Sequence, residues 1–228
     1  MTARTARAKR EQIIDAAARL IHLRGYRSTS IEEILRATGI GKGNFYYYFA
    51  SKEELGFAIL DWQTSRFAEG VLQKAFGDKR DPLDQIHAYL DLLLELARKS
   101  GCRGGCPVGN LAQELSDTHE GFRRRLDRAF EAWRAFLEGV LRRARTEGRL
   151  RRDADPARLS RFLLAGIEGA ILLAKVRKDP DVLADCFGEL RAHLAAWTVA
   201  GQRRLLPAAP TTPASFGARR RLKAVRPS

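Results

Sequence analysis

The strongest structural signal in this chain is GKGNFYYYFASKEEL, residues 41–55. Its first part predicts a short helix over 42–49, because Phe45 and Phe49 stand one helical turn apart and both suit burial. A second short helix is expected over 31–37, just before a turn that contains two glycines. Two short helices joined by such a turn form a helix-turn-helix, a motif that places its second helix in the major groove of DNA.

The composition of the helix at 42–49 strengthens this interpretation. Lys42, Gly43 and Asn44 occupy its N-terminus, where side chains can meet base edges and phosphates. Tyr46, Tyr47 and Tyr48 lie between the two inward-facing phenylalanines, so at least two of them must face outward, where their hydroxyls can bond phosphate oxygens. Lys52, at the start of the next helix, is a further candidate phosphate contact. The alternative is that the tyrosines only cover a small core.

With Thr-Ser-Ile-Glu-Glu-Ile at 29–34, this segment resembles the DNA-binding domain of the TetR/AcrR family of bacterial one-component repressors. The resemblance covers residues 9–60 and includes Tyr46 and Lys52, whereas the family often has His at one of the next two tyrosine positions. It implies that Thr29 and Ser30 cap a helix at a phosphate and that residues 42–44 contact bases. It also implies a homodimer on a palindromic operator in double-stranded DNA, with a helical ligand-binding domain behind.

Apolar spacing and helix-start signals predict an all-α chain of about nine helices, with no strand alternation and no repeats. Besides the two short helices, the expected spans are 9–23, 52–74, 82–99, 108–115, 120–147, 156–178 and 180–200. The domains predicted from this pattern are a disordered basic arm at 1–8, the helix-turn-helix domain at 9–55, a ligand-binding and dimerisation domain at 56–200, and a disordered basic tail at 201–228.

The net charge of +14 is concentrated at the two ends of the chain. Residues 1–60 hold ten Lys or Arg against six Asp or Glu, and residues 201–228 hold seven Lys or Arg and no acids. Basic ends suit a polyanion, so a second hypothesis is a basic architectural protein that binds nucleic acid or a membrane surface through its tails. For the tail, the alternative is simply a solvated, Arg-rich segment.

The chain carries no signal for secretion or membrane insertion. The N-terminus has no apolar core of the kind that a signal peptide needs, and the most apolar stretch, 162–174, is too short to span a bilayer and carries Glu168. Three cysteines are too few for a disulfide framework. These features predict a reducing, cytoplasmic location.

A helix over 156–177 has an apolar face with Gly166, Gly169 and Ala170, small residues that let another helix approach closely. Together with the last helix, it predicts a homodimer through residues 156–200, in which each subunit contributes two helices to a four-helix interface. The alternative is that this face packs only within its own chain.

The loop around Cys106 is the candidate sensor. The cysteine stands just before a helix N-terminus and near Arg103, and both features lower a thiol pKa. Cys102 is a candidate resolving thiol. The block 103–115 resembles a subgroup of the family that responds to acrylate-like or electrophilic small molecules, as does the segment 170–178, which contains Lys175.

From this resemblance and the helix faces we select four ligand or sensor residues: Cys106, Asn110, Trp133 and Lys175. The alternatives are a buried packing cysteine at 106 and a surface lysine at 175, whose apolar stem lies along the protein.

Metal-ion binding and catalysis are not expected. The four histidines are scattered and have no zinc-ligand spacing: His22, His87, His119 and His193. The sequence contains no Gly-rich phosphate loop, nucleophile elbow or paired catalytic carboxylates. We therefore expect neither a cofactor nor enzyme activity.

Overall fold

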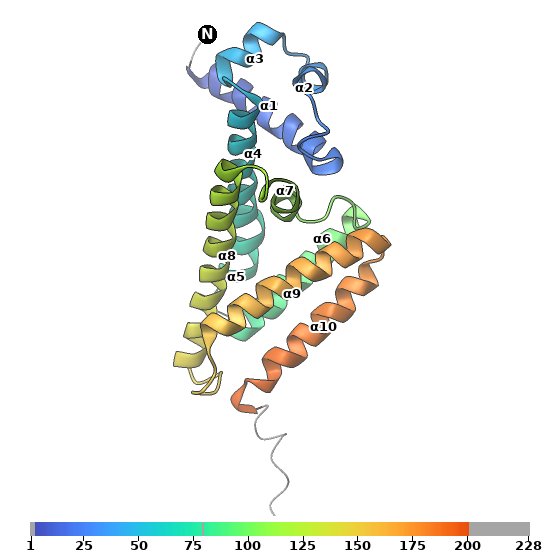
Figure 1. Ribbon diagram of the computed structural model, residues 1–228. Coiled ribbons are helices and arrows are strands. Elements are labelled where there is room, and N and C mark those ends of the chain that lie inside the picture. Colours follow the sequence, from blue (N-terminus) through green and yellow to red (C-terminus); the bar gives the residue numbers. More distant parts are fainter. Residues whose placement is uncertain (1–2, 79, 201–228) are drawn as a thin grey trace, which may run out of the picture.

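The computed structural model describes residues 3–78 and 80–200, and this part of the chain is helical throughout apart from its turns and loops (Figure 1). The elements are α1 (Ala3–Arg24), α2 (Ile31–Thr38), α3 (Lys42–Tyr48), α4 (Lys52–Phe67), the π-helix η1 (Ala68–Leu72), α5 (Gln73–Phe76), α6 (Pro82–Ser100), α7 (Pro107–Leu115), α8 (Glu120–Thr146), α9 (Pro156–Arg177) and α10 (Pro180–Ala196). Since α4, η1 and α5 follow one another without a break, the described residues form nine consecutive helices, which confirms the all-α prediction.

Side-chain caps start these helices where the sequence predicts. Ser30 and Glu33 form a complete capping box at α2, and the Ser51 side chain accepts a hydrogen bond from the backbone N–H of Glu54 at α4. Asp155 and Asp179 cap α9 and α10, each followed by a proline in the first helical turn. Local sequence therefore sets most of the helix starts.

The N-terminal boundary differs from the prediction. Residues 1–8 were expected to be a disordered arm, but α1 begins at Ala3. The physical reason is composition: this stretch has no Gly or Pro, and its Ala and Arg residues are strong helix formers that extend the amphipathic helix backward. The predicted disordered tail at 201–228 lies outside the described residues.

The apolar packing around the DNA-binding helices extends past residue 55. The apolar core between α1, α2, α3 and α4 continues into α7 and the first turns of α8, where Leu111, Leu115 and Phe122 are buried in the same cluster. A methyl group added to Gly56 of α4 would lie 2.6 Å from the Phe122 ring. Figure 1 shows α7 seated between α1 and the larger domain, so the two domains share a packed junction.

The larger domain packs α6, α8, α9 and α10 around a second core. Helices α9 and α10 lie side by side, and both contact the helices behind them. Gly166 permits the close approach of α9 to α10 of the same chain, because a methyl group there would lie 2.6 Å from Leu190. Ala170 is buried, and only Gly169 of the three small residues has open space beside it. Gly166 thus serves packing within the chain, as the alternative interpretation had it.

Candidate DNA-binding and effector sites

The N-terminal half of α3 is open to solvent. Lys42, Gly43 and Asn44 are all exposed, and a methyl group added at Gly43 would contact nothing within 4 Å. Phe45 and Phe49 are buried, as predicted, and tie the helix to α1 and α4. The side chains predicted to reach bases are therefore presented outward on a short helix that is anchored from behind.

The tyrosines of α3 divide as the spacing predicts. Tyr46 is 45% exposed and Tyr47 is 72% exposed, which is unusual for large aromatic side chains without a partner. Tyr48 differs from the prediction: it is half-buried against the core, and its hydroxyl is buried without a hydrogen-bond partner. Tyr48 is therefore not placed to contact a phosphate, because its ring stacks edge-on against Tyr47 and its oxygen points inward.

The phosphate contacts predicted for Thr29 and Ser30 have different outcomes in the structure. Thr29 is fully buried and its hydroxyl donates to the carbonyl of Gly25 at 2.8 Å, so the expectation that it meets a phosphate is wrong. Ser30 is exposed and caps α2, as predicted. Lys52 is half-buried, with its ammonium 4.5 Å from the centre of the Tyr26 ring, and burial lowers its pKa. A phosphate contact by Ser30 or Lys52 stays a prediction.

One residue that joins the two domains was missed in the sequence. Glu114 of α7 accepts hydrogen bonds from the backbone N–H groups of Tyr26 at 2.8 Å and Arg27 at 2.6 Å, just after α1 ends. Arg27 also donates to the hydroxyl of Thr118. N–H groups that follow a helix end need acceptors, but nothing in the sequence indicates which of the 27 acids supplies one.

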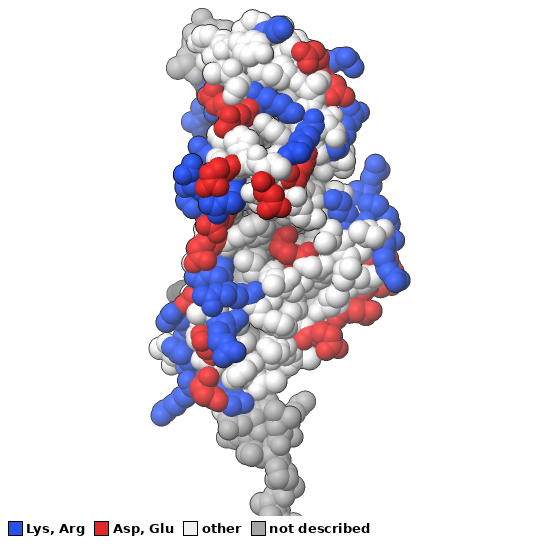
Figure 2. Space-filling model, viewed as in Figure 1, with Lys and Arg blue, Asp and Glu red and all other residues white. Residues whose placement is uncertain are grey.

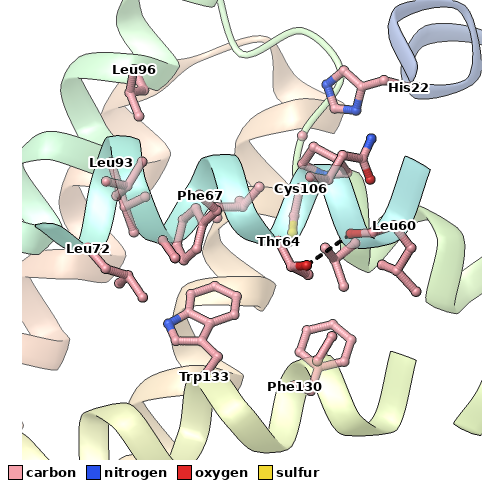
Figure 3. A pocket seen from close by; sticks show the side chains of 18 of the residues that line it. His22, Leu60, Thr64, Phe67, Leu72, Leu93, Leu96, Cys106, Phe130 and Trp133 are labelled. Carbon is pink, nitrogen blue, oxygen red and sulfur yellow. Dashed lines mark hydrogen bonds between the residues drawn. The ribbon is translucent and has the colours of Figure 1, made fainter. Parts of the chain in front are cut away.

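The larger domain contains a deep apolar pocket of about 800 Å³ between α4, η1, α6 and α8, closed at one end by the loop before α7 (Figure 3). Phe67 and Leu72 form one wall, and Phe130 and Trp133 of α8 face them. Its volume lies in the range of pockets that enclose drug-sized ligands. Phe130 and Trp133 are half-buried because they border this space.

Three of the four predicted sensor residues come together beside the loop before α7, and of these only Cys106 also lines the large pocket. Lys175 of α9 donates to the side-chain oxygen of Asn110 at 2.8 Å, and the Asn110 amide donates to the carbonyl of Gly104 at 2.7 Å. Cys106 lies beside them and lines the pocket. Trp133 lines the same pocket from α8, on a different wall. Lys175 is thus tied to α7 and is not a free surface lysine.

The expectation that the Cys106 thiol has a lowered pKa is wrong. The thiol does cap α7, accepting from the N–H of Gly109 at 3.3 Å, but burial and the neighbouring Glu168 carboxyl raise its pKa well above the ordinary value. Burial also raises the pKa of Glu168 itself. The sequence did not indicate this contact of Glu168, since the residue interrupts the apolar face of α9 one turn from Ile171 and carries no motif.

Two features are absent from the part of the chain that the structure describes: a metal-binding group and a membrane-spanning helix. No group of three or more His, Cys, Asp and Glu side chains is arranged to hold a metal ion there. None of the helices in that part of the chain has the length and hydropathy needed to cross a bilayer.

Comparison with known families matches both domains. Residues 13–59 match the model of bacterial regulatory proteins of the tetR family, and residues 82–189 match the tetracyclin repressor-like C-terminal domain. The transcriptional regulator AcuR of Cereibacter sphaeroides is 35% identical over 174 residues, covering 76% of this chain and 79% of AcuR. The chain belongs to the TetR family. Membership implies operator DNA as partner, a homodimer and no enzymatic activity.

Other TetR-family relatives agree with this assignment. The transcriptional repressor NemR of Escherichia coli K12 is 26% identical over 82% of this chain and 94% of NemR. The crystal structure of regulatory protein TetR from Rhodobacter sphaeroides superposes with a TM-score of 0.75 at 34% identity, covering 80% of this chain and 97% of that one. The reduced form of E. coli NemR gives a TM-score of 0.75 at 26% identity, covering 84% and 97%.

For a homodimer of this family, α9 presents a suitable face. Phe162, Leu172, Leu173 and Val176 are all exposed on α9, with Val176 at 73%. They recur along one side of the helix, and Figure 2 shows a largely uncharged surface over α9 and the adjoining part of α10. An exposed apolar stripe of this kind is typical of interaction surfaces.

Proposed function

We propose that this protein is a ligand-responsive transcriptional repressor, which binds a palindromic operator as a homodimer and releases it when a small molecule fills the pocket. The observation that carries the proposal is the combination of an exposed α3 with a deep apolar pocket in one helical chain. Lys42, Gly43 and Asn44 would contact base edges, while Tyr46 and Tyr47 would contact the phosphates beside them.

The dimer would form through α9 and α10. A two-fold axis through the exposed stripe of Phe162, Leu173 and Val176 would pair it with the same stripe of a second copy. Two copies of α3 would then face successive major grooves, about 34–36 Å apart. Repression by the relatives DhaR and NemR is stated in their names, and it supports repression here.

For release, we favour non-covalent filling of the pocket over thiol modification. A thiol with a raised pKa holds little of the reactive thiolate near neutral pH. Cys106 nevertheless lines the pocket, so an electrophile that enters it would meet the sulfur. The two triggers separate in one measurement: if an electrophile releases the wild type from DNA but not Cys106→Ser, the covalent trigger is correct.

The experiment that tests the repressor proposal titrates the protein onto a fluorescent duplex from the region upstream of its own gene. We expect wild type to bind as a dimer, and the Lys42→Ala/Tyr46→Phe double variant to bind at least about tenfold more weakly, since it loses one base contact and one phosphate contact. Lys74→Ala, an exposed lysine on α5, is the control for lost charge and should bind like wild type. Equal binding by the double variant would reject the proposal.

The alternative, a basic protein acting through its tails, predicts a different result in the same assay. Deletion of residues 203–228 would then abolish binding. Under the repressor proposal, the deletion only weakens binding and flattens its salt dependence, by about 0.9 in the log–log slope for each lost phosphate contact.

A further inference from the structure

A histidine of the DNA-binding domain forms part of the pocket wall. His22 lies near the C-terminal end of α1, yet it lines the pocket that α4, α6 and α8 enclose (Figure 3). Its Nδ1 atom is buried and has no hydrogen-bond partner. An unpartnered buried nitrogen is costly unless another molecule pairs with it. This makes His22 a place where a bound molecule would touch the DNA-binding domain itself.

The loop before α7 holds the ring in this position. Gly104 has φ +82° and packs directly on the Nε2 edge of His22, where any side chain at 104 would overlap the ring. The carbonyl of Gly104 is held by Asn110, and Gly105 lies against the stem of Lys175. The imidazole is therefore clamped along one edge, while Nδ1 is left without a partner.

The charges around this pocket favour an anion. Arg103, Arg125 and Arg128 line it, against a single acid, Asp61. Asp61 and Arg125 lie 3.6 Å apart and offset each other, which leaves Arg103 and Arg128 as the excess positive charge. Arg103 directly precedes the glycine that packs on His22. Burial and the nearby Lys175 ammonium lower the pKa of His22, so its ring is neutral at pH 7 and can donate one hydrogen bond.

We propose that the pocket binds an apolar carboxylate, one of whose oxygens accepts a hydrogen bond from His22 Nδ1 while the apolar body lies between α4 and α8. This deepens the proposed function and rests on it. A three-carbon acid of the acrylate type would leave most of the roughly 800 Å³ unfilled, so the body must be larger. Because α1 is packed against α2 and α4 of the DNA-binding domain, a ligand that prefers one position of His22 also prefers one position of that domain.

The test uses three probes that share a ten-carbon chain and differ in the head group: decanoate, decan-1-ol and decylamine. Each is titrated calorimetrically into the full chain, with decanoate and decylamine kept below their micelle concentrations and decan-1-ol below its solubility limit. We expect decanoate to bind wild type at least about tenfold more tightly than the other two, and to lose about tenfold in affinity in His22→Phe, which keeps the ring but removes both nitrogens. His87→Phe is the matched control, because His87 on α6 is also half-buried with an unpartnered Nδ1 but lies outside the pocket.

A second measurement observes His22 in the wild-type protein, so its result does not depend on whether His22→Phe folds. In wild type labelled with ¹⁵N at histidine, decanoate should shift the imidazole nitrogens of His22 and leave those of His87 in place. The proposal is overturned if decanoate fails to bind, if decylamine or decanol binds as tightly, or if the His22 nitrogens do not move. Operator binding without any probe is measured in parallel. Its loss in wild type rejects the repressor function, whereas intact operator binding with unmoved His22 signals rejects only the carboxylate contact.

Discussion

The two domains of this protein differ in how completely they fill their interiors. Around α3, the core side chains Phe45 and Phe49 are each 1% exposed. Between α4 and α8, the chain instead leaves a pocket of about 800 Å³. A DNA-reading helix needs one fixed geometry, whereas a sensor must keep space for a ligand.

The largest effect that follows from this contrast concerns an aromatic residue in each domain. Phe45→Ala removes a ring from the closed core and should lower the free energy of unfolding by about 3–5 kcal/mol. Trp133→Ala removes a ring that already borders a cavity, so we expect less than half that cost. Urea denaturation followed by far-UV circular dichroism measures both, and equal costs would contradict the difference in packing.

The sequence predicts the first domain well because its signals are local. Capping residues such as Ser30 and the spacing of Phe45 and Phe49 act within one or two helical turns, so they can be read without knowing the rest of the fold. Thr29 and Tyr48 were misjudged for the same reason: whether a polar group faces solvent or a neighbouring helix depends on how α1 and α4 pack against it.

The second domain is predicted only in outline. Its helices and its apolar faces follow from periodicity, but the pocket arises where segments from α1, α4, α6 and α8 meet. The roles of His22, Glu114 and Glu168 depend on partners 62 or more positions away, such as the backbone N–H groups of Tyr26 and Arg27 that donate to Glu114. The Cys106 pKa was misjudged because the helix N-terminus is visible in the sequence, while Glu168 and the burial are not.

The loop that joins the two domains contains two glycines, Gly101 and Gly104, that differ in their surroundings. Gly101 and Gly104 both have positive φ, but only Gly104 has a neighbour where a side chain would lie. Gly101→Ala should therefore cost only the left-handed strain, about 1–2 kcal/mol. Gly104→Ala adds the overlap with His22 and should cost about 2–4 kcal/mol. Thermal unfolding of the two variants compares them directly.

The same two variants, Gly101→Ala and Gly104→Ala, are also expected to differ in their affinity for the operator. If the loop couples the pocket to α1 through His22, Gly104→Ala should also change operator affinity, and Gly101→Ala should not. Identical behaviour of the two variants in both measurements would mean that the loop tolerates a side chain against the ring, and that the two domains are not tightly joined there.

The smallest effect concerns the buried carboxyl beside Cys106. Burial raises the pKa of Glu168 above its ordinary value of 4.5, so the folded state holds this proton more tightly than the unfolded state does. The associated stability is present below pH 4.5 and is lost as the pH rises through the folded pKa, because the charged form is then buried.

The Glu168→Gln variant tests this effect, because it keeps the shape of the side chain without the charge. It should raise the Tm by about 2–4 °C at pH 8 and leave it unchanged at pH 4. Glu69→Gln, on the exposed side of η1 and outside the proposed dimer interface, is the matched control and should not change the Tm at either pH. A gain for Glu168→Gln that is equally large at pH 4 would assign the effect to packing and remove charge burial as its cause.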